Sequence, residues 1–306
     1  MSGLALILIF DVLSAIKEVY AAHLLQNIEP HLLIFTCFLT TFLYFNFIHI
    51  KDFTLYRESL KKDLKCVTWL NFTTLGSWFT FFYAIKYIEP AVASALIIAL
   101  GPIVTIILGK YLRPGSPVLK SEFFASIGIF ISILLLGIVT WSGKSGMGFI
   151  PSTETCIGFV ASIICGVCIV GNTFFGKRLN DEGWPATKVM AARFFLLLFV
   201  SGLLCLKTSP DLQLLNNYSL GFILIAIFGT IIPLYCLQKG IEKTEPITVA
   251  LAVSIAPLFT YFMQAFDSRL SSSIYSFATI IFVLFFIGLG IFSRYGGMLW
   301  VQERKS

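Results

Sequence analysis

Charged residues are scarce in this chain: they make up 12% of its 306 residues, whereas hydrophobic residues make up 57%. A soluble domain carries about 25% charged residues, because charge keeps its surface in water. The mean hydropathy is correspondingly high, at +0.88. This small number of polar groups cannot cover a water-facing surface. The composition therefore predicts an all-α integral membrane protein whose main partner is the lipid bilayer.

Groups that carry catalysis or bind metals and nucleotides are also few. The three histidines all fall in or beside the first two apolar runs, which makes a serine–histidine pair hard to assemble. Cys165 and Cys168 form a Cys-x-x-Cys inside an apolar run, without a redox or metal context. The stretch 143–146 lacks the glycine that a phosphate-binding loop needs five residues earlier, where Ile138 stands. The sequence predicts no enzyme, no metal site and no cofactor.

The net charge of +6 is spread in small basic groups between apolar runs, so we expect no nucleic-acid partner. This distribution is typical of an orientation signal. With the amino terminus inside, the cytoplasmic loops and tail hold 15 Lys and Arg, against four in the outer loops. Cytoplasmic loops carry the excess of basic residues. Both termini are therefore predicted to be cytoplasmic, and we expect the membrane to be the bacterial cytoplasmic (inner) membrane.

Ten apolar runs are long enough to cross a bilayer, which takes about 20 residues per helix. They cover residues 3–24, 31–50, 66–86, 89–110, 121–142, 155–175, 186–206, 218–238, 246–266 and 273–294. The longest break, from Lys51 to Lys65, is too short for a soluble domain. Ten transmembrane helices are therefore predicted.

Two stretches indicate that the chain is a pair of five-helix units, residues 1–150 and 151–306. The segment from Tyr83 to Pro90 recurs loosely from Lys239 to Pro246, and both end in Glu-Pro. An odd number of helices per unit makes the second unit enter the membrane from the opposite side. Inverted repeats of this kind build many secondary transporters, with the substrate site near the midplane.

These residues also resemble a known family. The run from Phe82 to Leu96, followed by Gly101-Pro102, is similar to the passage between the third and fourth helices of EamA-type transporters in the drug/metabolite transporter superfamily. Arg193-Phe194 resembles part of its second repeat, whereas Cys37-Phe38 departs from the common Arg-Phe of the first. The resemblance implies ten helices and the export or uptake of small-molecule metabolites such as amino acids and their derivatives, by a monomer or a homodimer.

The first predicted helix carries charges at membrane depth, where each costs about 2.5–3.5 kcal/mol. Asp11 is the only aspartate well inside a predicted helix, and Ser14 and Glu18 share its face by helical spacing. Asp11 is a candidate carrier of a proton or cation, a partner for a substrate amine, or a structural group facing water. Lys17 and Glu18 either line the same pathway or snorkel toward the interface.

Further polar side chains fall inside other predicted helices. Arg193 stays charged, so we expect Asp11 or Glu18 to pair with it, unless it holds a substrate carboxylate. The other candidates for lining the pathway are Asn71, Thr74, Trp78 and Tyr83 in the third helix, Asn172 in the sixth, Gln238 in the eighth and Gln264 in the ninth. An aromatic ring beside amide and hydroxyl groups suits an amphipathic metabolite.

Prolines in the fourth and ninth predicted helices suggest where the protein bends. Pro102, which follows Gly101, and Pro257 each remove a backbone hydrogen bond. Small residues four apart on the fourth helix permit close packing, which suggests the repeat interface; they are Ala91, Ala95 and Ala99. Gly101, Pro102 and Pro257 are therefore the predicted hinge and packing residues.

Together these features predict a secondary transporter of small metabolites that works by alternating access, because the sequence carries no nucleotide-binding element. A lipid or lipid-linked sugar flippase is the alternative transport function. An intramembrane enzyme or a membrane scaffold is the alternative of another class, although a scaffold needs no embedded charges.

Overall fold

The computed structural model describes residues 2–50, 53–107, 120–208, 219–244, 249 and 252–303. Regular structure in these ranges is helical throughout. In chain order the elements are α1 (Gly3–Leu24), α2 (Pro30–Ile48), α3 (Phe53–Lys62), α4 (Leu64–Tyr87), α5 (Pro90–Ile107), α7 (Lys120–Trp141), α8 (Ser152–Asp181), α9 (Ala186–Ala192), α10 (Phe195–Thr208), α12 (Ser219–Leu224), the π-helix η2 (Ile225–Ile231), α13 (Ile232–Lys243), α15 (Ala256–Met263), the 3₁₀ helix η3 (Gln264–Phe266) and α16 (Ile274–Glu303).

Several of these helices are long and apolar enough to cross a membrane. Five such spans are found among the described residues, namely Pro30–Ile48, Phe123–Trp141, Ser152–Asp181, Ala186–Thr208 and Ser219–Lys243. Two shorter apolar helices, Pro90–Val104 and Ile274–Gly290, accompany them. The protein is therefore a multi-pass integral membrane protein.

Local signals place the helix starts. The Ser2 hydroxyl accepts a hydrogen bond from the Ala5 amide at 3.3 Å and caps α1. Proline opens α2 at Pro30 and α5 at Pro90. A proline is favourable in the first turn, where its missing N–H has no partner to lose.

The structure adds detail that the apolar runs do not predict. The helix α3 lies within the stretch expected to be a loop, and the run 186–206 is interrupted at Arg193. The run 218–238 contains the π-helix η2. The second Glu-Pro, at Glu245 and Pro246, lies outside the described residues, as does the basic loop around Lys110.

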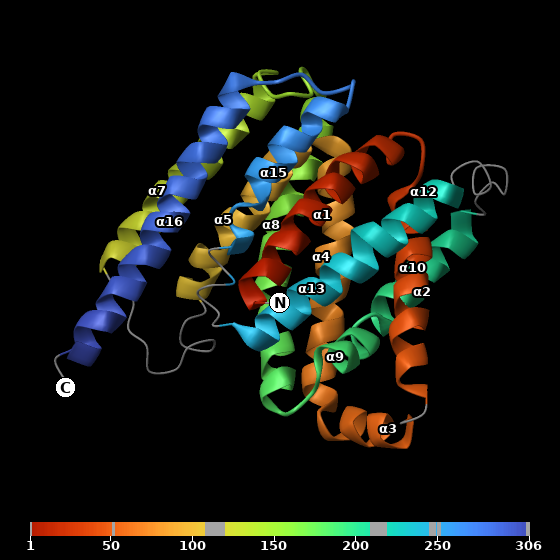
Figure 1. The fold of residues 1–306 in the computed structure, drawn as a ribbon. Coiled ribbons are helices and arrows are strands. Elements are labelled where there is room, and N and C mark those ends of the chain that lie inside the picture. The colour runs from red at the N-terminus through yellow and green to blue at the C-terminus, as the bar shows by residue number, and fades with distance from the viewer. Residues whose placement is uncertain are drawn as a thin grey trace.

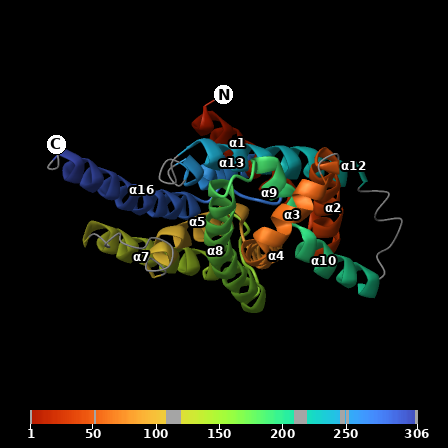
Figure 2. The same cartoon turned by 90° about the horizontal axis from the view of Figure 1, so that it is seen from below.

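Helices α7 and α16 run antiparallel as a pair along one flank of the molecule, and the other helices form a bundle beside them (Figure 1). Figure 2, turned by 90°, shows the same separation of this pair from α2, α10 and α12. The α7–α8 and α15–α16 connections lie together at one end of the bundle, and α3 lies at the opposite end (Figure 1).

The interior of the bundle is built around α4, α8 and α5, which pack closely. At Gly166 of α8, an added Cβ would lie 2.7 Å from the backbone oxygen of Ile97 in α5. Only glycine permits this approach, and small residues are the usual means by which membrane helices come together. The alanines expected at a helix interface, Ala91, Ala95 and Ala99, are all fully buried.

Candidate transport site

Four polar side chains of α1 lie inside the protein. Asp11 is fully buried, and Ser14, Lys17 and Glu18 are at most 7% exposed. Asp11 stands eight residues into α1, about 12 Å along the helix axis. Neither the carboxylate oxygens of Asp11 nor the Ser14 hydroxyl has a hydrogen-bond partner within the described chain. A buried polar group without a partner is costly, which makes this pair the strongest candidate for binding a proton or a ligand.

Lys17 points into the bundle rather than toward the membrane interface. Its Nζ lies 4.8 Å from the ring centroids of both Trp78 and Phe81 on α4. A desolvated ammonium group over an aromatic face gains about 2 kcal/mol. Its stem packs on Gly229, where an added Cβ would meet Lys17 Cγ at 2.7 Å. The snorkelling alternative therefore does not describe Lys17.

Glu18 joins α1 to the second half of the chain. Its Oε2 accepts a hydrogen bond from Thr260 Oγ1 of α15 at 2.7 Å. Glu18 is 7% exposed, so it does not reach the interface either. The charges of α1 thus connect α4 on one side with α15 on the other.

The π-helix η2 shapes the wall that receives Lys17. Pro233, just after it, has no N–H and disfavours regular α-helical bonding in the preceding turn. The Thr230 hydroxyl donates to the Ile225 carbonyl, five residues back, at 3.0 Å. Single π-helical turns occur frequently at functional sites, and here the irregular turn presents Gly229 to the Lys17 side chain.

A polar cluster between α4 and α8 centres on Asn172. Its Oδ1 accepts from Thr73 Oγ1 at 2.8 Å and from Thr74 Oγ1 at 3.0 Å, and its Nδ2 donates to Ser77 Oγ at 2.8 Å. Arg193 Nε lies 3.4 Å from Thr74 Oγ1. The structure therefore brings together three of the predicted residues, Asn172, Thr74 and Arg193.

Arg193 occupies the break between α9 and α10, and Asn71 forms hydrogen bonds to both sides of that break. Asn71 Nδ2 donates to the Ala192 carbonyl at 2.8 Å, and the Leu196 amide donates to Asn71 Oδ1 at 3.2 Å. Asn46 Nδ2 donates to the Ala191 carbonyl at 3.1 Å. Asn71 thus holds the interrupted helix together, and Asn46, which also contacts the break, was not predicted.

The predicted pairing of Arg193 with Asp11 or Glu18 is not what the structure shows. Arg193 is 7% exposed and, within the described residues, forms no ion pair. Its guanidinium lies 5.6 Å from the Phe194 ring and faces α4 across Thr74, whereas Glu18 faces α15. Arginine remains charged, so the broken helix holds a cation that no carboxylate among the described residues neutralises.

A chain of aromatic rings connects the region of Lys17 with the region of Arg193. Phe38 of α2 lies 4.7 Å from Trp78 and 5.2 Å from Phe194 between ring centroids. Trp78 in turn lies under the Lys17 ammonium. Phe38 follows Cys37, which stands where the family's first repeat commonly has arginine. The sequence analysis did not identify Phe38 as a site residue.

Glu89, which entered the sequence analysis only through the repeated Glu-Pro, contacts four segments at one end of the bundle. This fully buried carboxylate accepts hydrogen bonds from the Gly146 amide at 2.6 Å, from Ser276 Oγ at 2.6 Å and from Gln264 Nε2 at 2.8 Å. Gln264 Oε1 also accepts from the Ala91 amide at 2.7 Å. We call Glu89, Gly146, Gln264 and Ser276 the Glu89 clasp. Gln264 therefore belongs to this clasp and not to the Asp11 region.

The remaining predicted residues lie apart from the charged regions. Tyr83 is half-buried and stacks on Tyr87 at 6.4 Å, and Gln238 Nε2 donates to Asn180 Oδ1 at 3.4 Å. Gly101 and Pro102 lie inside α5. Pro257 differs from the expectation of a mid-helix proline, because it stands in the first turn of α15, where no helical hydrogen bond is lost.

Comparison with known proteins decides the family. Residues 1–138 and 156–297 match the EamA-like transporter family, which covers most of the chain in two segments. The chain belongs to this family. It is a membrane transporter of small molecules, as sequence resemblance predicted.

One relative of this EamA-like transporter and one solved structure place the match in context. Protein PecM of Dickeya dadantii (strain 3937) is 25% identical over 254 residues, which is 77% of this chain and 80% of PecM. A solved crystal structure superposes with a TM-score of 0.66 at 17% identity, covering 94% of this chain and 95% of the other. That likeness shows the shared fold.

Proposed function

We propose that this EamA-like transporter moves amphipathic metabolites of the amino-acid class across the cytoplasmic membrane, by proton-coupled alternating access. One observation carries the proposal: the Asp11 carboxyl is fully buried on α1 and, in the described chain, has no hydrogen-bond partner. Embedded carboxylates mark proton and ion pathways. Asp11 is the proposed proton carrier, with Ser14 beside it.

The substrate class follows from the chemistry around the two charged regions. Arg193 offers a guanidinium without a carboxylate partner in the described part of the structure, which suits a substrate carboxylate. Asp11, once deprotonated, suits an amine. The rings of Phe38 and Trp78 lie between Arg193-Phe194 and Lys17 and suit an apolar body.

Alternating access requires that one end of the protein opens while the other closes. We propose ten membrane spans in two inverted repeats, residues 1–150 and 151–306, with both termini in the cytoplasm. The Glu89 clasp then lies at the outer end, and it joins Glu89 and Gly146 of the first repeat to Gln264 and Ser276 of the second. Its closure supports a conformation shut toward the outside.

The proposal is tested by mass-spectrometric profiling of metabolites inside and outside cells that overproduce the protein. Wild type is compared with Asp11→Asn and with Glu154→Gln, a control that removes a carboxylate from the first turn of α8. All three variants are matched for abundance in the membrane. We expect one class of carboxylate-bearing amphipathic metabolites to redistribute with wild type and the control but not with Asp11→Asn.

Two results would count against the proposal in different ways. Equal redistribution by wild type and Asp11→Asn would remove Asp11 from the mechanism. Redistribution confined to lipids, measured by lipid flipping in vesicles, would replace the amino-acid class with a lipid substrate.

A further inference from the structure

A cavity of about 270 Å³ lies between the start of α4 and the end of α8, apart from the Asp11 region. Three cationic side chains line it: Lys62, Lys65 and Arg178. Its volume is just below the range of about 300–1,000 Å³ that is usual for drug-sized ligands. A small charged group therefore fits it better than a whole metabolite of that size.

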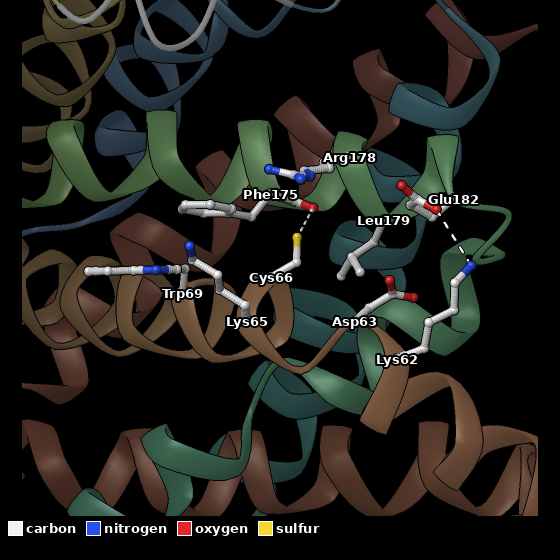
Figure 3. A pocket seen from close by; sticks show the side chains of 9 residues that line it. All are labelled: Lys62, Asp63, Lys65, Cys66, Trp69, Phe175, Arg178, Leu179 and Glu182. Carbon is white, nitrogen blue, oxygen red and sulfur yellow. Dashed lines mark hydrogen bonds and ion pairs between the residues drawn. The ribbon is translucent and has the colours of Figure 1, made fainter.

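The two acidic residues of this cavity are already engaged. Glu182 pairs with Lys62 at 3.6 Å, and Asp63 Oδ2 accepts a hydrogen bond from the Trp184 indole at 2.8 Å. Lys65 and Arg178, by contrast, form no ion pair within the described chain. Figure 3 draws the Lys62–Glu182 pair at one end of the cavity, with Lys65 and Arg178 nearer the other. Three cations against two carboxylates leave the lining of the cavity with a net charge of +1.

An aromatic pair stands beside the two cations. The rings of Trp69 on α4 and Phe175 on α8 stack with centroids 6.4 Å apart and planes at 11° (Figure 3). Trp69 follows Lys65 by one helical turn, and Phe175 precedes Arg178 by three residues, so each helix presents one ring and one cation. Trp69 is 52% exposed. Tryptophan at a helix end is typical of the headgroup level of a bilayer.

We propose that this cavity binds the headgroup of an anionic phospholipid through Lys65 and Arg178, with its acyl chains beside Trp69 and Phe175. Basic pockets between membrane helices on the cytoplasmic side bind anionic headgroups. A phosphodiester accepts hydrogen bonds from both cations, and arginine in particular matches two phosphate oxygens. Under the proposed orientation, the lipid belongs to the cytoplasmic leaflet. The site does not depend on which substrate is transported.

The test is native mass spectrometry of the protein taken from bilayers with equal phosphatidylglycerol and phosphatidylcholine. Wild type is compared with Lys65→Gln/Arg178→Gln. The matched control is Lys144→Gln/Lys207→Gln, which removes two exposed cations, one from the α7–α8 connection and one from the last turn of α10. We expect wild type and the control to retain phosphatidylglycerol preferentially, and the first variant to lose about 30-fold of that preference, as two cations contribute.

A charge-preserving exchange, Lys65→Arg/Arg178→Lys, is expected to keep most of the preference, which separates charge recognition from packing. Two outcomes would overturn the site. One is an unchanged preference in Lys65→Gln/Arg178→Gln. The other is displacement of phosphatidylglycerol by millimolar glycerol phosphate or inorganic phosphate, which would assign the cavity to a soluble anion.

Discussion

Replacing Glu89 with alanine is expected to open the end of the protein that the Glu89 clasp holds shut. The variant leaves three donors without their acceptor: the Gly146 amide, Gln264 Nε2 and Ser276 Oγ. Hydrogen bonds between side chains within membranes average about 0.6 kcal/mol each. Bonds to a charged group reach roughly 1.5–3 kcal/mol.

Three bonds at the lower value amount to about 1.8 kcal/mol. Every 1.4 kcal/mol is a factor of ten in a population, so the closed state loses at least about 20-fold relative to the open state. Glu89→Gln keeps an amide oxygen as acceptor but turns an NH₂ toward the donors, and we expect an intermediate shift. Glu154→Gln, a carboxylate exchange in the first turn of α8, is the control and is expected to change nothing.

The assay is the rate at which a membrane-impermeant maleimide, added outside, labels Ala95→Cys in a cysteine-free background. Ala95 is fully buried on α5, a little over one turn after Ala91, whose amide joins the clasp. We expect labelling about 20-fold faster in Glu89→Ala than in the Ala95→Cys parent. Amide hydrogen exchange at Gly146 is expected to rise in parallel. Unchanged labelling and exchange, in protein of equal abundance and monodispersity, would refute the reasoning.

Three further predictions concern stability in detergent. Asn71→Ala unpairs both sides of the α9–α10 break, so we expect a loss of about 2 kcal/mol or more, measured by thermal unfolding. Gly166→Val forces a side chain against the α5 backbone 2.7 Å away and is expected to cost about 1–3 kcal/mol, whereas Gly288→Ala meets no atom within 4 Å and should keep the wild-type midpoint. Burial raises the pKa of Asp267, but hydrogen bonds from Arg269 outweigh burial and hold it below its ordinary value. A carboxyl whose pKa is lower in the folded than in the unfolded protein stabilises the fold at pH values above its unfolded pKa. This stabilisation is lost as the pH falls through its folded pKa. Asp267→Asn should therefore lower the midpoint at pH 7, and the difference from wild type should vanish in acid.

The sequence predicts the membrane class, the family and most helix boundaries because these depend on long apolar runs. The run 3–24 coincides with α1, and 121–142 differs from α7 by one residue. Helix breaks within an apolar run cannot be predicted in this way. Nothing in the composition around Arg193 distinguishes a regular helix from an interrupted one, because the compensating groups, such as Asn71, come from distant segments.

For the same reason, the sequence predicts some properties of the polar site residues and not others. Helical spacing predicts that Asp11 and Glu18 share a face of α1, but it leaves open whether Lys17 and Glu18 snorkel to the interface; the structure places all three inside. Their hydrogen-bond partners cannot be predicted from the sequence, because Thr260 is 242 positions from Glu18 and Gly146 is 57 from Glu89. The repeated Glu-Pro, which we interpreted as evidence of a duplication, drew attention to Glu89 but did not predict its partners.

The measurement that tests the central proposal most directly is substrate flux in proteoliposomes with and without a pH gradient. Wild type is expected to accumulate the metabolite identified by profiling when a gradient is imposed, and to exchange it when none is present. If Asp11 carries the proton, Asp11→Asn will retain exchange and lose gradient-driven accumulation. Accumulation by Asp11→Asn at the wild-type level would contradict the account.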